Sequence, residues 1–236
     1  MMIFIGCAIT IGSVLGGYLM HGGVLLALHQ PSEVLIIGGA ALGSLIVATP
    51  ISVMKGIIGG LKKIIFGGSF AKKDYLDQLV MMFEVFNVAR RDGLVGLENH
   101  VERPQESEIF KRYPKFLKNH HAFNFFNDTM RVIISGAVQP HDLEDLMNED
   151  LEAMHHEEER PANALSAVAD ALPGLGIVAA VLGVVITMQS INGPPEEIGH
   201  KVAAALVGTF LGILLSYGFV GPLAAALKNR LGEDAQ

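Results

Sequence analysis

The chain is poor in cysteine, tryptophan and charged residues. It has one cysteine and no tryptophan among 236 residues, and only 17% of the residues are charged. The single thiol, Cys7, excludes a disulfide scaffold within one chain and a cysteine-based metal cluster. The formal net charge of −7 argues against a nucleic-acid partner, which would need a basic surface.

Hydrophobic residues are abundant instead, at 50% of the chain, and the mean hydropathy is +0.42. Crossing a bilayer takes about 20 apolar residues in a helix. Four stretches without internal Lys or Arg meet that length, namely residues 2–20, 34–54, 166–190 and 202–227. We therefore predict an all-α integral membrane protein with four transmembrane helices and a large helical cytoplasmic domain between helices 2 and 3.

Most of the 17 basic and 24 acidic residues fall between the second and third spans. Because Lys and Arg are retained on the cytoplasmic side, this polar block and both chain termini are expected inside. Short outward connections follow at 21–33, which includes Glu33, and at 191–201. The predicted segments are a transmembrane hairpin at 1–54, the cytoplasmic helical domain at 55–165, transmembrane helices 3 and 4 at 166–228, and a short cytoplasmic tail at 229–236.

Within the polar block, residues 70–95 have the pattern of an amphipathic helix. Its apolar positions are Leu76, Leu79, Val80, Phe83, Phe86 and Val88. A turn is predicted at Asp92-Gly93. Further helices are expected at 106–118, 122–135 and 140–159.

All four spans carry small residues four positions apart, which let helix backbones approach closely in lipid. The pairs are Gly12 and Gly16, Gly39 and Gly43, Gly176 and Ala180, and Gly208 and Gly212. Packing within the chain explains them most simply. Contact with other subunits is the alternative, because four helices offer more such faces than one bundle uses.

No span has an ionisable residue at mid-depth, so the chain alone has no proton relay. Its third and fourth spans carry hydroxyls and prolines instead. Pro173 and Pro222 are expected at the cytoplasmic mouth as a hinge, and Thr187 and Thr209 are expected toward the outer side at matching depth. Thr209, Ser216 and Tyr217 are expected on one helix face. The simpler interpretation of each hydroxyl is a hydrogen bond to the carbonyl four residues earlier.

Arg90, Arg91 and Glu98 bring opposite charges together around Gly93, where solvation is their ordinary role. The histidine pairs at 120–121 and 155–156 lack metal-ligand spacing. No nucleotide loop, nucleophile elbow or HExxH motif occurs. We therefore expect no catalytic residues, no metal, no cofactor and no enzymatic activity.

Several motifs resemble the flagellar motor stator protein A family, which includes MotA and PomA. They are GGYLMHGG at 16–23, RRDGLVGLE at 90–98, PQESEIF at 104–110, LPGLGIVAAVLGVV at 172–185 and VGTFLGILLSYGFVGPLA at 207–224. The order of two spans, a charged block and two more spans is also similar, so the resemblance covers essentially the whole chain.

This resemblance implies a torque-generating ion channel in the bacterial inner membrane. Five copies would surround two single-span helices of a MotB-like B subunit, whose membrane aspartate binds the coupling ion. The implied ion-pathway and hinge residues are Asp170, Pro173, Ala180, Thr187, Thr209, Tyr217 and Pro222. Arg90 and Glu98 would meet a FliG-like rotor switch protein.

Sodium-driven members tend to carry extra hydroxyls where this chain has Ala180 and Gly208, so protons are the expected ion and a PomA-like sodium stator is the alternative. A proton-driven energiser of the ExbB or TolQ type is the nearest rival, but those chains have three spans. A further cytoplasmic segment often follows the fourth span in this family, so a truncated tail is expected after residue 236.

Overall fold

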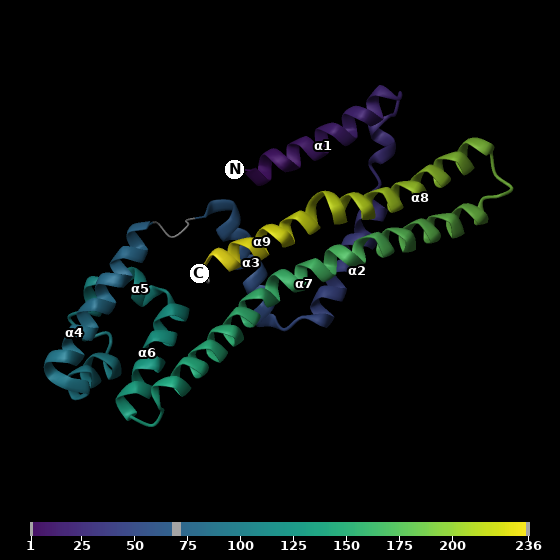
Figure 1. Ribbon diagram of the computed structural model, residues 1–236. Helices are drawn as coiled ribbons and strands as arrows, with labels where there is room; N and C mark the ends of the chain where they lie inside the picture. Colours follow the sequence, from purple (N-terminus) through teal and green to yellow (C-terminus); the bar gives the residue numbers. More distant parts are fainter. Residues whose placement is uncertain (1, 68–71, 235–236) are drawn as a thin grey trace. The chain divides into compact units, whose positions relative to one another are not determined.

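The computed structural model describes residues 2–67 and 72–234, and these residues are almost entirely helical (Figure 1). Two compact units form, one from Met1–Gly67 with Glu158–Gln236 and the other from Gly68–Glu157. No strand occurs in the described ranges, so the predicted all-α fold class is confirmed. The first unit is called the membrane unit below, and the second the polar unit.

Four helices in the described residues are long and apolar enough to cross a membrane, as predicted. The first, α1 (Met2–Met20), has the predicted bounds. The second span was predicted at 34–54, but the apolar helical segment lies earlier in the chain, at Leu25–Ala48. A 3-10 turn η1 (Leu25–Leu28) leads into α2 (Pro31–Ala48), and Pro50 separates α2 from α3 (Ile51–Phe66) because a proline disfavours helical backbone in the residue before it.

Helix α3 is amphipathic and belongs to the membrane unit although the sequence analysis assigned most of it to the polar block. It buries Val53, Ile57 and Gly60. Gly60 contacts Leu227 of α9 (Gly221–Asp234), and a Cβ on Gly56 would meet Pro161 Cγ at 2.8 Å. The absence of side chains at these two glycines therefore lets α3 pack closely against the rest of this unit.

The predicted third span is the apolar half of α7 (Pro140–Gln189), a helix that continues through Pro161 and Pro173. The predicted fourth span is divided into α8 (Pro195–Leu215), a π-helical turn η3 (Ser216–Val220) and the start of α9. Figure 1 shows α7 and α8 side by side in opposite directions, joined by a short turn.

Close backbone approach holds α7 against α8. A Cβ on Gly176 would meet Gly212 Cα at 3.1 Å, and a Cβ on Gly183 would meet Ala205 Cβ at 2.7 Å. Packing within the chain is therefore confirmed for these small residues. The glycines on the other two spans behave differently, since a Cβ would meet nothing within 4 Å at Gly12, Gly16, Gly39 or Gly43.

The polar unit contains α4 (Lys72–Glu102), η2 (Phe110–Arg112), α5 (Pro114–Lys118), α6 (His120–Ser135) and the first part of α7. Its core is aromatic, and Phe110 meets Phe123 and Phe126 edge to face at 6.2 and 6.1 Å. The predicted helix at 106–118 is wrong as one element, because Tyr113 before Pro114 has non-helical backbone and separates η2 from α5.

The apolar stripe expected on residues 70–95 is mostly exposed, and residues 70–71 lie outside the described residues. Met81 and Val85 form the buried face instead, four residues apart and within the core cluster that includes Phe126. The exposed positions are Leu76, Leu79, Val80, Phe83 and Phe86. An apolar stripe of this kind is available for contact with another chain.

Candidate functional site

The predicted pathway residues all lie on the α7–α8 hairpin and its continuation through η3 into α9. Helix α7 carries four of them, α8 carries Thr209, η3 carries Tyr217 and α9 carries Pro222. The four on α7 are Asp170, Pro173, Ala180 and Thr187. The hairpin therefore brings them onto two adjacent antiparallel segments, as the sequence predicted.

Pro173 changes the hydrogen bonding of α7. A proline has no N–H, so the carbonyl oxygen of Ala169, four residues earlier, loses its usual helical donor. Ser216 Oγ donates a hydrogen bond of 2.6 Å to this oxygen, and both residues are buried. The freed carbonyl of one helix is thus satisfied by a hydroxyl from the next.

The π-helical turn begins at this same serine. Gly221 donates its backbone N–H to the carbonyl of Ser216, five residues earlier, and Pro222 follows directly. Single π-turns inside helices occur frequently at functional sites. Ser216 is buried while Tyr217 is 73% exposed, so the prediction that they share a face with Thr209 is wrong. Successive helix residues are about 100° apart, and the π-turn adds to this offset.

The expected match in depth between the two threonines and between the two prolines is also wrong. Gly176 lies opposite Gly212 and Gly183 lies opposite Ala205, which sets the register of the antiparallel pair. In this register Thr187 lies about two helical turns, roughly 12 Å, beyond Thr209. Pro173 and Pro222 are staggered by a similar amount.

The two threonines also differ in hydrogen bonding. Thr187 is buried, and its hydroxyl donates to the Gly183 carbonyl at 2.8 Å, which is the simpler interpretation made from the sequence. Thr209 is half-buried, and its hydroxyl has no hydrogen-bond partner within the described part of the chain. Thr209 is therefore the threonine whose oxygen remains available to a ligand.

Asp170 lies next to Ala169 but points to the exposed side of α7. Over residues 2–67 and 72–234, it forms no ion pair or hydrogen bond. An unpaired exposed carboxylate one residue from the Ala169–Ser216 contact is compatible with the predicted exit position.

One buried acid, Glu33, was not predicted as a site residue. Glu33, expected in an outward connection, lies in the first turn of α2 with 5% of its surface exposed. The acid lies at the end of the helix, so the prediction that no span has an ionisable residue at mid-depth is not affected, but the placement of Glu33 in an outward connection is wrong. The signal was present in the spacing, because Glu33, Ile37 and Ala41 recur every four residues and all three are buried.

A second candidate site lies in the polar unit. Helix α4 is interrupted at Gly93, whose φ of 73° and ψ of −176° confirm the predicted break. Arg90 and Glu98 lie on either side of this break and are exposed. Neither one forms an ion pair or hydrogen bond with any residue that the structure describes. Both charges are therefore available to a partner.

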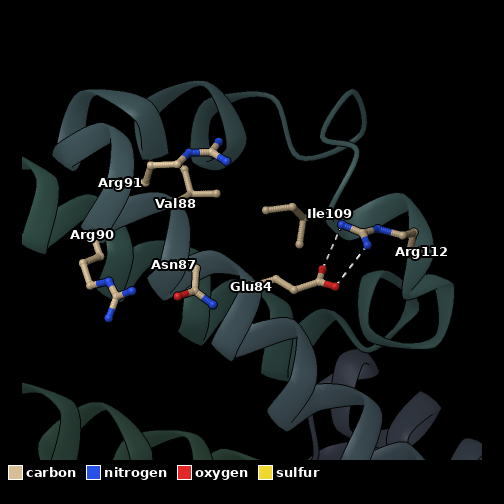
Figure 2. Close-up of a pocket in the computed structure, with 7 residues that line it drawn as sticks. All are labelled: Glu84, Asn87, Val88, Arg90, Arg91, Ile109 and Arg112. Carbon is tan, nitrogen blue, oxygen red and sulfur yellow. Dashed lines mark hydrogen bonds and ion pairs between the residues drawn. The ribbon is translucent and has the colours of Figure 1, made fainter.

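Arg90 borders a surface pocket together with Glu84, Asn87, Val88, Arg91, Ile109 and Arg112. Figure 2 shows Arg112 joined to Glu84, while the guanidinium of Arg90 points away from this pair. Arg112 donates a hydrogen bond from Nη1 to Glu84 Oε1 at 3.0 Å, and its Nη2 forms an ion-pair contact with Oε2 at 2.9 Å. Arg112 is neutralised by Glu84 and Arg91 by Asp92, so Arg90 is the lining arginine left to attract an acidic partner among the described residues.

Local interactions shift two pKa values near this pocket. Arg91 donates hydrogen bonds to the Asp92 carboxylate, and these bonds hold the pKa of Asp92 below its usual range. Burial, followed by the negative charge of Glu84, raises the pKa of Tyr113. The pocket wall is thus fixed by local charge pairs, and Arg90 is left free beside them.

The described residues contain no group of three His, Cys, Asp or Glu side chains that could hold a metal ion.

Comparisons with known proteins match the whole chain. Residues 4–93 match the family model of the motility protein A N-terminal region, and residues 117–236 match that of the MotA/TolQ/ExbB proton channel family. Among solved structures, the chain resembles MotAB of C. jejuni with a TM-score of 0.71 at 21% identity, covering 99% of this chain and 83% of that one. It also resembles the flagellar MotAB stator complex from Bacillus subtilis, with a TM-score of 0.68 at 23% identity and coverage of 98% and 83%.

Curated relatives are more similar in sequence. Chemotaxis protein LafT of Vibrio parahaemolyticus is 40% identical over 231 residues, covering 98% of this chain and 81% of the relative. Motility protein A of Salmonella typhimurium and that of Escherichia coli are each 43% identical over 236 residues, covering 100% of this chain and 80% of each relative. With such identity along its entire length, this chain belongs to the motility protein A family.

Proposed function

We propose that this protein is a stator subunit of the bacterial flagellar motor, which forms an ion channel with a B subunit and converts ion flow into torque. The observation that carries the proposal is its identity of 43% with two motility A proteins over all 236 residues. The similar solved structures, described as MotAB, support a B-type partner. The proposed activity is ion translocation and not enzymatic catalysis.

The proposed location is the bacterial inner membrane, with both termini and the polar unit in the cytoplasm. The distribution of Lys and Arg supports this orientation, because the polar block between spans 2 and 3 carries most of them. Four candidate spans in the described residues also favour a stator subunit over the three-span ExbB or TolQ type.

The proposed ion path runs along the α7–α8 hairpin, whose residues 171–189 and 202–220 carry no Asp, Glu, Lys or Arg. The carboxylate that binds the coupling ion then belongs to the B subunit. Ala180 and Gly208 offer no hydroxyl oxygens, while Thr209 offers one. Such a sparse oxygen set suits a proton, which needs one acceptor and no coordination shell.

The proposed hinge is the segment joined by the Ala169–Ser216 hydrogen bond. A proton crossing about 150 mV releases about 3.5 kcal/mol. Exchange of one hydrogen bond is worth about 0.5–1.5 kcal/mol, so one proton supplies enough free energy to rearrange the contact between Pro173 and η3.

The proposed contacts with the rotor switch protein are Arg90 and Glu98, which are exposed and unpaired among the described residues. Exposed charge pairs are weak and screened by salt, which suits repeated engagement and release. The proposed assembly is a ring of five copies. The open glycines of α1 and α2 and the exposed stripe of α4 supply surfaces for its subunit contacts.

The direct test is complementation. The chain is expressed with its cognate B subunit in a non-motile strain that lacks both stator genes, and single-motor rotation is recorded at varied external pH and sodium. We expect rotation whose speed follows the proton gradient at constant sodium. Absence of rotation despite assembly in the membrane would contradict the stator function, and speed that follows sodium at constant pH would contradict the proton.

A further inference from the structure

Glu33 is an acidic side chain buried in the membrane unit for which the proposed function gives no role. It lies one helical turn before Ile37, which belongs to the core cluster that α2 forms with α7. Only 5% of its surface is exposed. Its carboxyl group therefore points with Ile37 and Ala41 into the packed side of α2.

The carboxyl group occupies space left by a missing side chain on α8. A Cβ on Gly208 would lie 2.7 Å from Glu33 Oε2, 3.1 Å from Ala179 Cβ and 3.3 Å from the backbone nitrogen of Ala180. Any residue larger than glycine at position 208 would displace the carboxyl oxygen. Glu33 is thus built into the crossing of α7 and α8, at the level of a predicted pathway residue, Ala180.

Among residues 2–67 and 72–234, no cation or hydrogen-bond donor pairs with this carboxylate. Its Oε2 atom is buried and has no hydrogen-bond partner within the part of the chain that the structure describes. On the facing helices, α7 has no ionisable side chain between Asp170 and its end, and the nearest base on α8 is Lys201, which pairs with Glu197 and Ser190. His29, four residues before Glu33 and outside α2, is exposed.

An isolated carboxylate in an apolar environment is unfavourable, and binding a cation removes that charge. The N-terminal turn of α2 favours the charged form instead, because the positive end of a helix dipole stabilises an anion there. These two effects act on the same group in opposite directions. A carboxyl group in this position is suited to gain and lose a proton.

We propose that Glu33 is a proton-binding site of the ion path which this chain itself supplies, on the outer side of the B subunit's carboxylate. This inference rests on the proposed stator function. The carboxylate oxygen takes a proton from hydronium, which leaves water and a neutral carboxylic acid. The acid then gives the proton to the next carboxylate inward, and its own negative charge is restored.

The test uses the complex of the full chain with its B subunit in proteoliposomes. Proton flux at an imposed membrane potential is measured with a pH-sensitive dye, and the carboxyl C=O band is followed by infrared difference spectroscopy between two pH values. The variants are Glu33→Gln, which keeps the shape of the side chain, and Glu33→Asp, which keeps the acid. The matched control is Glu196→Gln, because Glu196 is an exposed acid near the start of α8.

We expect Glu33→Gln to lower the flux about tenfold and to remove one titrating carboxyl band. Glu33→Asp should keep the band and part of the flux, and Glu196→Gln should leave the flux unchanged. Unchanged flux with Glu33→Gln, or an infrared difference spectrum identical to that of the unmodified complex, would overturn the inference while leaving the stator function intact. If the unmodified complex carries no flux, the stator function fails, and the infrared band alone then decides whether Glu33 binds a proton.

Discussion

Ser216 Oγ donates a 2.6 Å hydrogen bond to the Ala169 carbonyl oxygen, the atom that Pro173 deprives of its helical donor. One proline and one serine on neighbouring helices therefore act together. The bond lies at the start of the π-turn η3, so it joins the irregular segments of both helices. This relationship gives the hinge proposed for the stator a defined chemical contact.

Replacing Ser216 with Ala should leave the buried Ala169 carbonyl without a donor. The expected loss is about 1–3 kcal/mol in the free energy of unfolding, measured by thermal unfolding of the complex in detergent. Thr187→Ala is the matched control, because Thr187 is equally buried but donates to a carbonyl inside its own continuous helix. Equal losses for the two variants would show that the Ser216 bond has no special role.

Replacing Pro173 with Ala should restore an N–H four residues after Ala169 and compete with Ser216 for the same oxygen. We expect normal amounts of assembled complex in the membrane but little or no torque, measured as rotation of a tethered cell. Gly174→Ala is the control, since a Cβ there meets nothing within 4 Å. Normal rotation of the Pro173 variant would refute the hinge.

Reversing the charges of Arg90 and Glu98, by Arg90→Glu and Glu98→Lys, should abolish swimming and leave proton flux unchanged. The reason is that both side chains are exposed and unpaired among the described residues, so they contribute little to folding. Swimming is measured by cell tracking and flux in proteoliposomes. Lys118→Glu, an exposed reversal in the same unit, should swim normally. Persistent swimming after both reversals would count against a role in rotor contact.

Tyr113 should ionise at higher pH than an ordinary tyrosine, because burial and Glu84 raise its pKa. The neutral side chain makes its full contribution to the stability of the polar unit when the pH is below the tyrosine pKa of the unfolded chain, which is about 10. This contribution is lost as the pH rises through the raised pKa of the folded state. Tyrosinate absorbance measures this directly, since the chain has four tyrosines and no tryptophan. Tyr113→Phe should remove the phase that titrates at the highest pH, and Glu84→Gln should lower its midpoint. An unchanged absorbance curve in both variants would contradict the assignment.

The apolar spans were predictable from length and hydropathy, and α1 has its predicted bounds. The second span was misplaced because the apolar pattern continues past Pro50 into α3, an amphipathic helix that packs on α9 and does not extend α2. Hydropathy averaged over a window cannot distinguish one continuous spanning helix from a spanning helix that is followed by a separate amphipathic helix. The backbone restriction imposed by Pro50 was the more informative signal.

The position of the predicted pathway residues on two antiparallel helices was predictable, but the contacts between those helices were not. Pro173 and Ser216 were both singled out, but the hydrogen bond from Ser216 to the Ala169 carbonyl was not predicted, because it depends on the register between α7 and α8. Glu33 was assigned to an outward connection because the second apolar stretch was taken to begin at residue 34, whereas α2 begins at Pro31. Contacts between helices follow from three-dimensional packing, which the spacing along one helix does not specify.

The central claim is that this chain forms the walls of a path whose coupling carboxylate, the one that flux requires, belongs to the B subunit. The most direct measurement is proton flux at an imposed membrane potential in proteoliposomes that contain this chain alone or together with its B subunit. We predict flux only when both chains are present, and its loss when the B subunit's membrane aspartate is replaced by asparagine. Sustained flux through this chain alone would contradict the account.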